Sequence, residues 1–273
     1  MNWKRASAHD ETRRQLLEAA GEVFADVGFR NATVRQICHR AGVNVAAVNY
    51  HFGDKEQLYA EVLHDSQQKA FEKYPPLLDV SDDAPPEKKL EAFIRSFLLR
   101  IFDKSSSAWF GKMMSREMVE PTAALNALLE SRIRPMAGLL GSIVAEILRK
   151  SAASNQRSAA KGHPQATTHS NLTATNPLVR LCCFSIVSQC VFFHHCRTMI
   201  SRLFPEQQLD GTAVEQLARH VTRFSLAAMT HLADADRPRA GRREPKARSH
   251  AAGARGRPRP TPASRPSTKQ EKR

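Results

Sequence analysis

The segment 33–55 constrains this chain most, because two short helix patterns within it are separated by a single glycine. Val34 and Ile37 recur with the spacing of a helix, and Gly42 follows at the point where the chain must turn sharply. The spacing therefore predicts a short helix over 33–40 that ends in a tight turn.

A second short helix is predicted to begin at Val45, with Asn44 as its N-cap. Val48 and Phe52 lie four residues apart and face inward, so the opposite side is small at its start and able to hydrogen-bond at its end. Such a surface can enter a DNA major groove, where Asn and Tyr side chains reach base edges and phosphates. Short helix pairs of this kind also occur in helical proteins that do not bind DNA.

A longer amphipathic helix precedes this pair, predicted over Thr12–Val27 and ended by Gly28. The three helices together make a helix-turn-helix unit. Asp54 is placed to cap the next helix, which is predicted to continue to about Tyr74.

The motifs along residues 16–63 resemble the N-terminal domain of the TetR family of transcriptional regulators. They include a Gly-Phe pair, Thr-x-x-x-Ile, Ala-Gly-Val, Tyr-x-Phe and Lys-Glu-x-Leu-Tyr. The sequence Asn49–Lys55, and the segments 115–125 and 184–197, resemble the branch with a CecR-like (CerR-type) C-terminal domain. One departure is Cys38, which stands where the family usually has alanine.

The resemblance implies a symmetric homodimer that reads a palindromic operator. It also implies an all-α chain, with an N-terminal three-helix helix-turn-helix DNA-binding domain over 10–55 and a helical ligand-binding and dimerisation domain over 56–235. The polar residues 1–9 are expected to be disordered and show no sign of a signal peptide. By position within the family motif, the residues expected to face DNA are Thr33, Asn44, Val45, Ala46, Asn49, Tyr50, His51 and Lys55.

The net charge of +14 is concentrated at the C-terminal end. Residues 237–273 hold 13 Lys or Arg against 2 acidic residues, which leaves +3 for the rest of the chain. The segment 236–273 is also rich in Pro, Gly, Ala and Ser, so we expect a disordered basic tail with salt-sensitive affinity for polyanions. Within it, Arg-Gly-Arg-Pro at 255–258 resembles the core of an AT-hook, which binds the minor groove; a chance match in a solvated tail is the alternative.

Helical patterns continue between the head and the tail. A helix around 109–118 carries aromatic and methionine side chains, which suit a pocket for an apolar small molecule and suit an ordinary core equally well. The polar segment at about 150–176 is expected to be a mobile loop. The candidate pocket residues are Trp109, Met113, Arg116 and Glu117.

The last two helical segments carry the predicted dimer interface. Residues 178–203 are apolar nearly all round, and residues 214–232 add a second long apolar face nearby. Two such helices from each chain would form a four-helix interface with twofold symmetry. The candidate interface residues are Phe184, Val187, Val191, Val221, Phe224 and Ala228.

The same region holds the weak candidates for a metal site. Cys183, Cys190 and His194 share roughly one helix face and could bind zinc or copper, although cysteine is also a common small core residue. The five cysteines make no disulfide framework and are expected to be reduced. The apolar run 181–193 is shorter than the roughly 20 residues that a membrane span needs. We therefore expect no metal, no cofactor and no membrane partner, and a cytoplasmic, nucleoid-associated protein.

The sequence thus predicts a DNA-binding transcriptional regulator, a repressor released from double-stranded operator DNA by an unknown small-molecule effector. Two alternatives stay open: a non-specific DNA-coating or architectural protein driven by the basic tail, and a metal- or thiol-responsive regulator. An enzyme is not expected, because the chain shows no Ser/His/Asp set, P-loop, zinc-protease helix or glycine-rich nucleotide motif.

Overall fold

The computed structural model describes residues 3–103, 109–159, 173–207, 209 and 211–235. Every regular element in this part of the chain is helical, which confirms the all-α prediction. The Arg-Gly-Arg-Pro motif, the basic tail and the centre of the predicted mobile loop lie outside the described residues. The helices are α1 (Trp3–Asn31), α2 (Val34–Ala41), α3 (Ala46–Phe52), α4 (Lys55–Lys73), α5 (Pro86–Phe102), α6 (Trp109–Glu117), α7 (Ala123–Leu128), a π-helical turn (Leu129–Ile133), α8 (Arg134–Ala159), α9 (Pro177–His195), α10 (Arg197–Leu203) and α11 (Val214–Ala235), with a 3₁₀ turn (Gly211–Ala213) before the last.

The first helix is longer than predicted at both ends. It begins at Trp3, so residues 3–9 of the segment that we expected to be disordered are helical, and residues 1 and 2 lie outside the described residues. That segment holds no Gly or Pro, so nothing in it breaks a helix. At the other end, Gly28 adopts φ +80° and makes a kink rather than a stop, and one further turn ends at Asn31.

Local capping explains the boundaries of the short helices. The Thr33 hydroxyl accepts from the backbone N–H of Gln36, whose side chain bonds back to the Thr33 backbone, and together they form a capping box. Gly42 ends α2 in the left-handed region, at φ +68°. Asn44 Oδ1 accepts from the Ala46 N–H at 2.9 Å, as expected of an N-cap, and α3 begins one residue later than predicted. Asp54 caps α4 through the Gln57 N–H at 2.7 Å.

Two hydrophobic cores form within the compact unit that covers residues 1–237. The first, which we call the head core, is built from α1 to α4 and also takes Met113 from α6 and Leu128 from α7. The second, the body core, is built from α5, α8, α9 and α11. Helix α4 contributes to the head core and also packs on α6 and α7, so the domain division at residue 55 stays a prediction.

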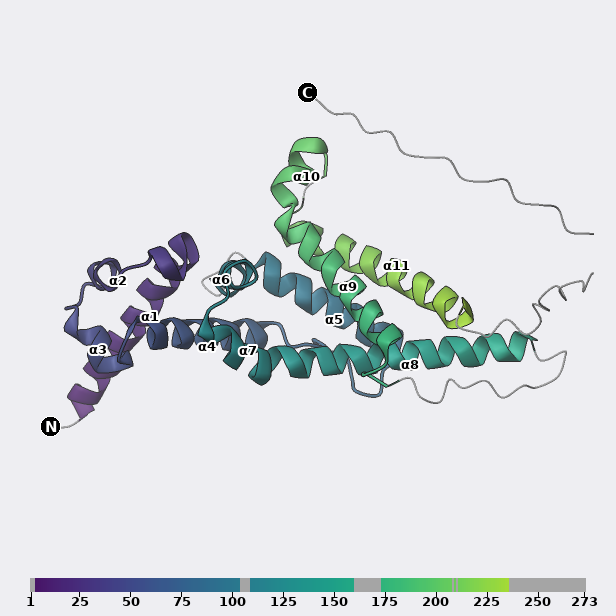
Figure 1. The fold of residues 1–273 in the computed structure, drawn as a ribbon, viewed down its shortest axis with the longest axis horizontal. Helices are drawn as coiled ribbons and strands as arrows, with labels where there is room; N and C mark the ends of the chain where they lie inside the picture. The colour runs from purple at the N-terminus through teal and green to yellow at the C-terminus, as the bar shows by residue number, and fades with distance from the viewer. Residues whose placement is uncertain (1–2, 104–108, 160–172, 208, 210, 236–273) are drawn as a thin grey trace, which may run out of the picture. The chain divides into compact units, whose positions relative to one another are not determined.

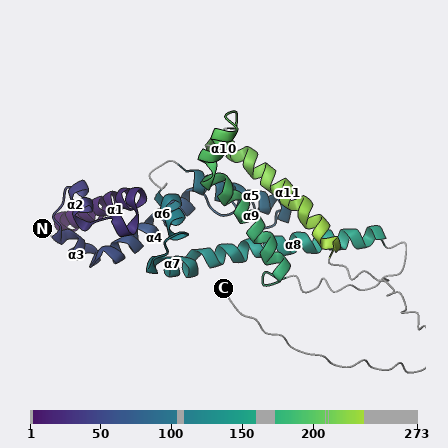
Figure 2. The same cartoon turned by 45° about the horizontal axis from the view of Figure 1, so that its top comes forward.

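The helices of the body pack against one another through their apolar faces. Helix α11 lies against α5 and α8, and α9 lies against α5, α8 and α11 (Figure 1, Figure 2). The π-helical turn leads directly into α8, which begins at Arg134. Helix α8 then runs to Ala159, so the first part of the predicted loop 150–176 is helical. The predicted helix over 178–203 is interrupted at Cys196 and forms α9 and α10.

Helix α9 is long and apolar enough to cross a membrane by length and composition alone, whereas the sequence led us to expect a run that is too short. Within the protein it packs on α5, α8 and α11, but only 22% of its most apolar window is buried. Much apolar surface on α9 therefore remains uncovered in a single chain.

A close approach between α1 and α6 depends on one glycine. A Cβ on Gly21 would collide with the indole ring of Trp109, so the two helices can meet at this distance only because the position lacks a side chain. This contact attaches α6 to the head.

We predict that Gly21→Ala destabilises the protein, because the added methyl forces the Trp109 ring out of its position. Overpacking of this kind costs about 1–3 kcal/mol of unfolding free energy. The matched control is Gly138→Ala on α8, where an added Cβ meets nothing within 4 Å. That change should stabilise the helix by about 0.5–1 kcal/mol. Urea unfolding followed by tryptophan fluorescence measures both, and equal effects of the two variants would contradict the close contact.

Candidate nucleic-acid interface and ligand cavity

The surface of α3 that the sequence predicted to meet DNA is open. Val48 and Phe52 are buried in the head core, which turns the other side of this short helix outward. Val45 is 45% exposed and Tyr50 76% exposed. The remaining exposed members of the predicted set are Thr33, Asn44, Ala46 and Asn49. This arrangement offers two small side chains at the helix start and an amide and a phenol further along.

The other two residues of the predicted set, His51 and Lys55, are only partly exposed. The Lys55 ammonium donates to the backbone carbonyls of Phe29 and Ala32, at 3.1 Å each, and lies 4.4 Å from the centre of the Phe29 ring. It therefore neutralises the carboxyl end of α1, which supplies the negative partner that a lysine at the start of a helix needs. His51 is half-buried, with its ring 4.4 Å from that of His9. Burial lowers the pKa of His51, and the neighbouring positive groups His9 and Arg13 lower it further.

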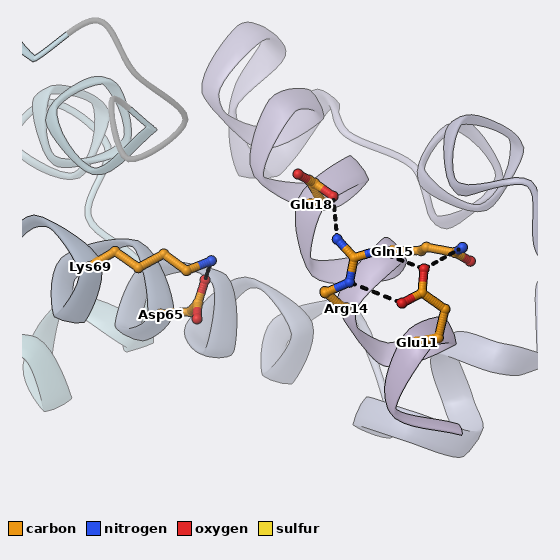
Figure 3. Close-up of polar contacts among 6 residues, drawn as sticks. All are labelled: Glu11, Arg14, Gln15, Glu18, Asp65 and Lys69. Atoms are coloured by element: carbon orange, nitrogen blue, oxygen red, sulfur yellow. Dashed lines mark hydrogen bonds and ion pairs between the residues drawn. The ribbon is translucent and has the colours of Figure 1, made fainter. Parts of the chain in front are cut away.

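Charged residues cover the side of α1 next to α4 (Figure 3). Arg14 bonds to Glu11 at 2.6 Å and to Glu18 at 3.4 Å, while Lys69 pairs with Asp65 on α4 at 2.8 Å. Arg14, Glu18, Asp65 and Lys69 border a polar hollow that Trp109 also lines. Because their charges are mutually paired and exposed, we assign this hollow no ligand.

A second cavity, of about 380 Å³, lies between the helices of the body. Its volume falls in the range of small-molecule sites. Its walls come from α4, α5, α6, α8 and α9, and they are mostly aromatic, methionine and aliphatic side chains. On α6 the lining residues are Phe110, Gly111, Met114 and Ser115, and Met118 lines the cavity from just after the helix.

The four predicted pocket residues do not line this cavity. They occupy the opposite side of α6, which faces the head. Met113 is fully buried in the head core. Trp109 meets Gly21, and Arg116 Nη2 donates to the Asp26 carbonyl at 2.6 Å.

Glu117 lies on the side of α6 that faces the head and is 1% exposed. Its Oε1 accepts from the Tyr59 hydroxyl at 2.7 Å and from the Thr122 hydroxyl at 2.9 Å, and its Oε2 accepts from the Thr122 N–H. Burial raises the pKa of Tyr59, and the hydrogen bond to Glu117 raises it further. The carboxylate is thus a link between α6 and α4 and has no free oxygen for a ligand.

The sequence did not single out two of the polar side chains that line the cavity. Gln67 on α4 is 1% exposed and Arg100 on α5 is 4% exposed. Both occur in helices with many other polar residues, so their burial has no signature in the sequence alone. Burial lowers the pKa of Arg100 to about 10.

The six predicted dimer residues differ in how far they are exposed. Phe184 and Phe224 are 66% and 60% exposed, and Ala228 is partly exposed. Val187 and Val191 are half-buried and line the cavity, as does Phe184 at its edge. Val221 is 0% exposed within the body core, so its assignment to a surface between chains is wrong.

The candidates for a metal or thiol sensor do not form a site. Among the described residues, no three His, Cys, Asp or Glu side chains are grouped so that they could hold an ion. Burial raises the pKa of Cys183 to about 11 and that of Cys190 to about 12, which keeps both thiols protonated and poorly reactive near neutral pH. Burial also lowers the pKa of His194 to about 4, so this ring is neutral.

Comparison with known proteins agrees with this two-part organisation. Residues 86–229 match the family described as "HTH-type transcriptional dual regulator CecR, C-terminal domain", and residues 16–62 match "Bacterial regulatory proteins, tetR family". The HTH-type transcriptional dual regulator CecR of Shigella flexneri is 31% identical over 145 residues, which cover 50% of this chain and 64% of that protein. The alignment thus spans slightly less than two thirds of the relative.

Solved structures share the fold at low sequence identity. A TetR-like transcriptional regulator from Rhodococcus sp. RHA1 has a TM-score of 0.50 and 18% identity, over 79% of this chain and 96% of that one. AibR, in complex with isovaleryl coenzyme A and operator DNA, has a TM-score of 0.51 and 18% identity, over 78% of this chain and 97% of that one. At this identity the likeness concerns the fold.

We predict that Lys55→Met destabilises the head, because the carbonyls at the end of α1 lose their charged donor. The expected loss is about 1–2 kcal/mol of unfolding free energy. The control is Lys69→Met, which removes an exposed pair with Asp65 and should change stability by less than about 0.5 kcal/mol. Thermal unfolding measures the two variants, and a Lys55→Met protein as stable as the control would contradict the capping role.

Proposed function

The chain belongs to the TetR family of bacterial transcriptional regulators, with a CecR-type C-terminal domain, and from this premise we propose that it represses transcription as an effector-responsive homodimer. In this proposal each of two heads reads one half of a palindromic operator, and a small molecule in the body cavity causes release. The family and the relative consist of transcriptional regulators rather than enzymes. We further propose that the protein acts in the cytoplasm, at the nucleoid.

The open side of α3 is the observation that carries the DNA-binding proposal. Asn49 supplies an amide that can pair with adenine in the major groove, and Tyr50 supplies a hydroxyl for a phosphate oxygen. Val45 and Ala46 are small enough for the start of the helix to approach the bases. His51 lies beside this surface, and we infer that Lys55 supports it from behind through the end of α1.

The exposed apolar side chains of α9 and α11 support the proposed dimer. Leu181, Phe184 and Phe192 on α9 are 61%, 66% and 49% exposed, and Phe224 on α11 is 60% exposed. Exposure of several large apolar side chains to water is unfavourable, and it is typical of a surface that a partner covers. A twofold axis would bring the same faces of two chains together and bury these side chains.

Helix α6 offers a route from the cavity to the head. Phe110 and Met114 face the cavity, while Glu117 is bound to Tyr59 on α4 and Arg116 to the Asp26 carbonyl on α1. A ligand that displaces the first side therefore also moves the second. We propose that this movement changes the separation of the two heads, which must match successive major grooves about 34 Å apart.

We predict that Asn49→Ala combined with Tyr50→Phe weakens operator binding roughly tenfold or more, because base and phosphate hydrogen bonds are lost. Genome-wide mapping of protected DNA first identifies the operator, and fluorescence anisotropy with that duplex then gives the affinity. Analytical ultracentrifugation should find the dimer unchanged.

The control for this experiment is Asn126→Ala, which removes an exposed amide on α7, far along the chain from the head. It should bind the operator as the unchanged protein does. Equal affinities of the double variant and this control would remove α3 from the proposed interface.

A non-specific DNA-coating protein is the second candidate, and the basic tail favours it. Residues 237–273 hold 13 Lys or Arg and 2 acidic residues. We predict that removal of these residues lowers affinity for random DNA steeply and reduces its salt dependence, while the preference for the operator over random DNA remains. Competition binding at two salt concentrations measures this, and loss of the preference would favour the coating function.

A further inference from the structure

The cavity is mostly apolar, and Gln67 in its wall carries an amide without a partner in the described part of the chain. The other polar side chains that line it are Arg100, Ser115, Arg132, His194 and His195. Neither Gln67 Nε2 nor Gln67 Oε1 has a hydrogen-bond partner among the described residues, although the side chain is 1% exposed. A buried amide in this condition is unfavourable unless something bonds to it. Because the side chain lines the cavity, a bound molecule is what could satisfy it.

Arg100 brings a positive charge to the same wall. Its Nη1 donates to the Tyr74 carbonyl at 2.7 Å and to the Ser96 hydroxyl at 2.6 Å, and its guanidinium lies 4.3 Å from the centre of the Phe71 ring. Nε and Nη2 have no protein acceptor within the part of the chain that the structure describes, and no carboxylate there pairs with this arginine. A cation this deeply buried is favourable only when an anion or several dipoles compensate it.

The two groups converge because Phe71 lies one helical turn after Gln67 on α4. The amide and the guanidinium therefore both lie beside Phe71 in the wall of the cavity. No Asp or Glu is among the described residues that line the cavity, and His194 there is uncharged. The charge of the described lining is therefore positive: Arg100 is buried, and Arg132, which also lines the cavity, is exposed.

We infer that the effector is an apolar organic acid, whose carboxylate binds the free nitrogens of Arg100 and the amide of Gln67 while its hydrocarbon body lies along the aromatic and methionine walls. Planar carboxylate and guanidinium groups form strong paired hydrogen bonds when shielded from water. The Gln67 amide adds a donor for the second carboxylate oxygen. As an effector, this molecule rests on the regulatory function proposed above; as a ligand, it can be tested on the protein alone.

The binding test compares three molecules that share a ten-carbon chain: decanoate, decanol and decylammonium. Isothermal titration calorimetry with the full chain, below the critical micelle concentrations, gives the affinities. Decanoate should bind roughly tenfold or more tightly than decanol, and decylammonium should bind most weakly, because only the acid supplies a negative head. Equal binding of the acid and the alcohol would overturn the inference.

Gln67→Met is the sharpest variant, because it keeps the side-chain length and removes only the unpartnered amide. It should weaken decanoate roughly tenfold and raise the melting temperature of the free protein. The matched control is Gln68→Met, which makes the same substitution on the exposed side of α4 and should leave decanoate binding unchanged. A Gln67→Met protein that binds decanoate as tightly as the control would contradict the role of the amide.

Arg100→Gln tests the charge. It should abolish the preference for decanoate over decanol while apolar binding persists, whereas an arginine with a purely structural role would lower stability and leave the preference intact. Should this variant fail to fold, the Gln67→Met comparison still decides the inference.

A test of operator release distinguishes the ligand-binding inference from the proposed regulatory function. If decanoate does not bind and another class of molecule releases the operator, the carboxylate inference is wrong and the regulatory function stands. If decanoate binds with the expected preference but the protein shows no operator, the regulatory function fails and the binding site stands.

Discussion

The rest of the structure depends on the packing of α6 in two directions. One side of this short helix closes the cavity with Phe110 and Met114, and the other is fixed to the head by Glu117 and by the contact of Trp109 with Gly21. Protein interiors are packed too densely for one side of such a helix to move while the other stays still. The cavity and the head are therefore parts of one mechanical unit, although their cores are separate.

The head could be predicted residue by residue because its boundaries follow from local chemistry. Thr33, Asn44 and Asp54 cap the helices that follow them, and Gly42 ends α2 in the left-handed region. Each of these interactions spans only two to four residues, so it is visible in the sequence. The start of α1 was predicted wrongly because its first turns have no apolar stripe that would indicate a helix. These turns are helical because no residue in them breaks a helix.

The site in the body could be predicted only in outline, because its details depend on contacts between distant segments. Apolar residues occur on both sides of α6, and periodicity does not say which neighbouring helix each side contacts. The sequence therefore suggested Met113 as a pocket residue, whereas Met114 lines the cavity. Likewise an apolar position such as Val221 looks the same whether its own chain or a partner covers it. Gln67 and Arg100 resemble surface residues until the helices around them are in place.

The single chain is left with two kinds of unfavourable group that a more stable sequence would lack. It exposes aromatic side chains such as Phe184 and Phe224 to water, and it buries the Gln67 amide, which has no partner among the described residues. Each defect lowers the stability of the isolated chain, and each is relieved by a different occupant: a second chain for the aromatic face and a polar ligand head for the amide. A molecule that fills the cavity therefore stabilises the filled conformation by mass action. Since α6 carries both the cavity wall and the contacts to the head, that stabilisation selects one arrangement of the head over others, which is the energetic requirement for a ligand to control binding elsewhere.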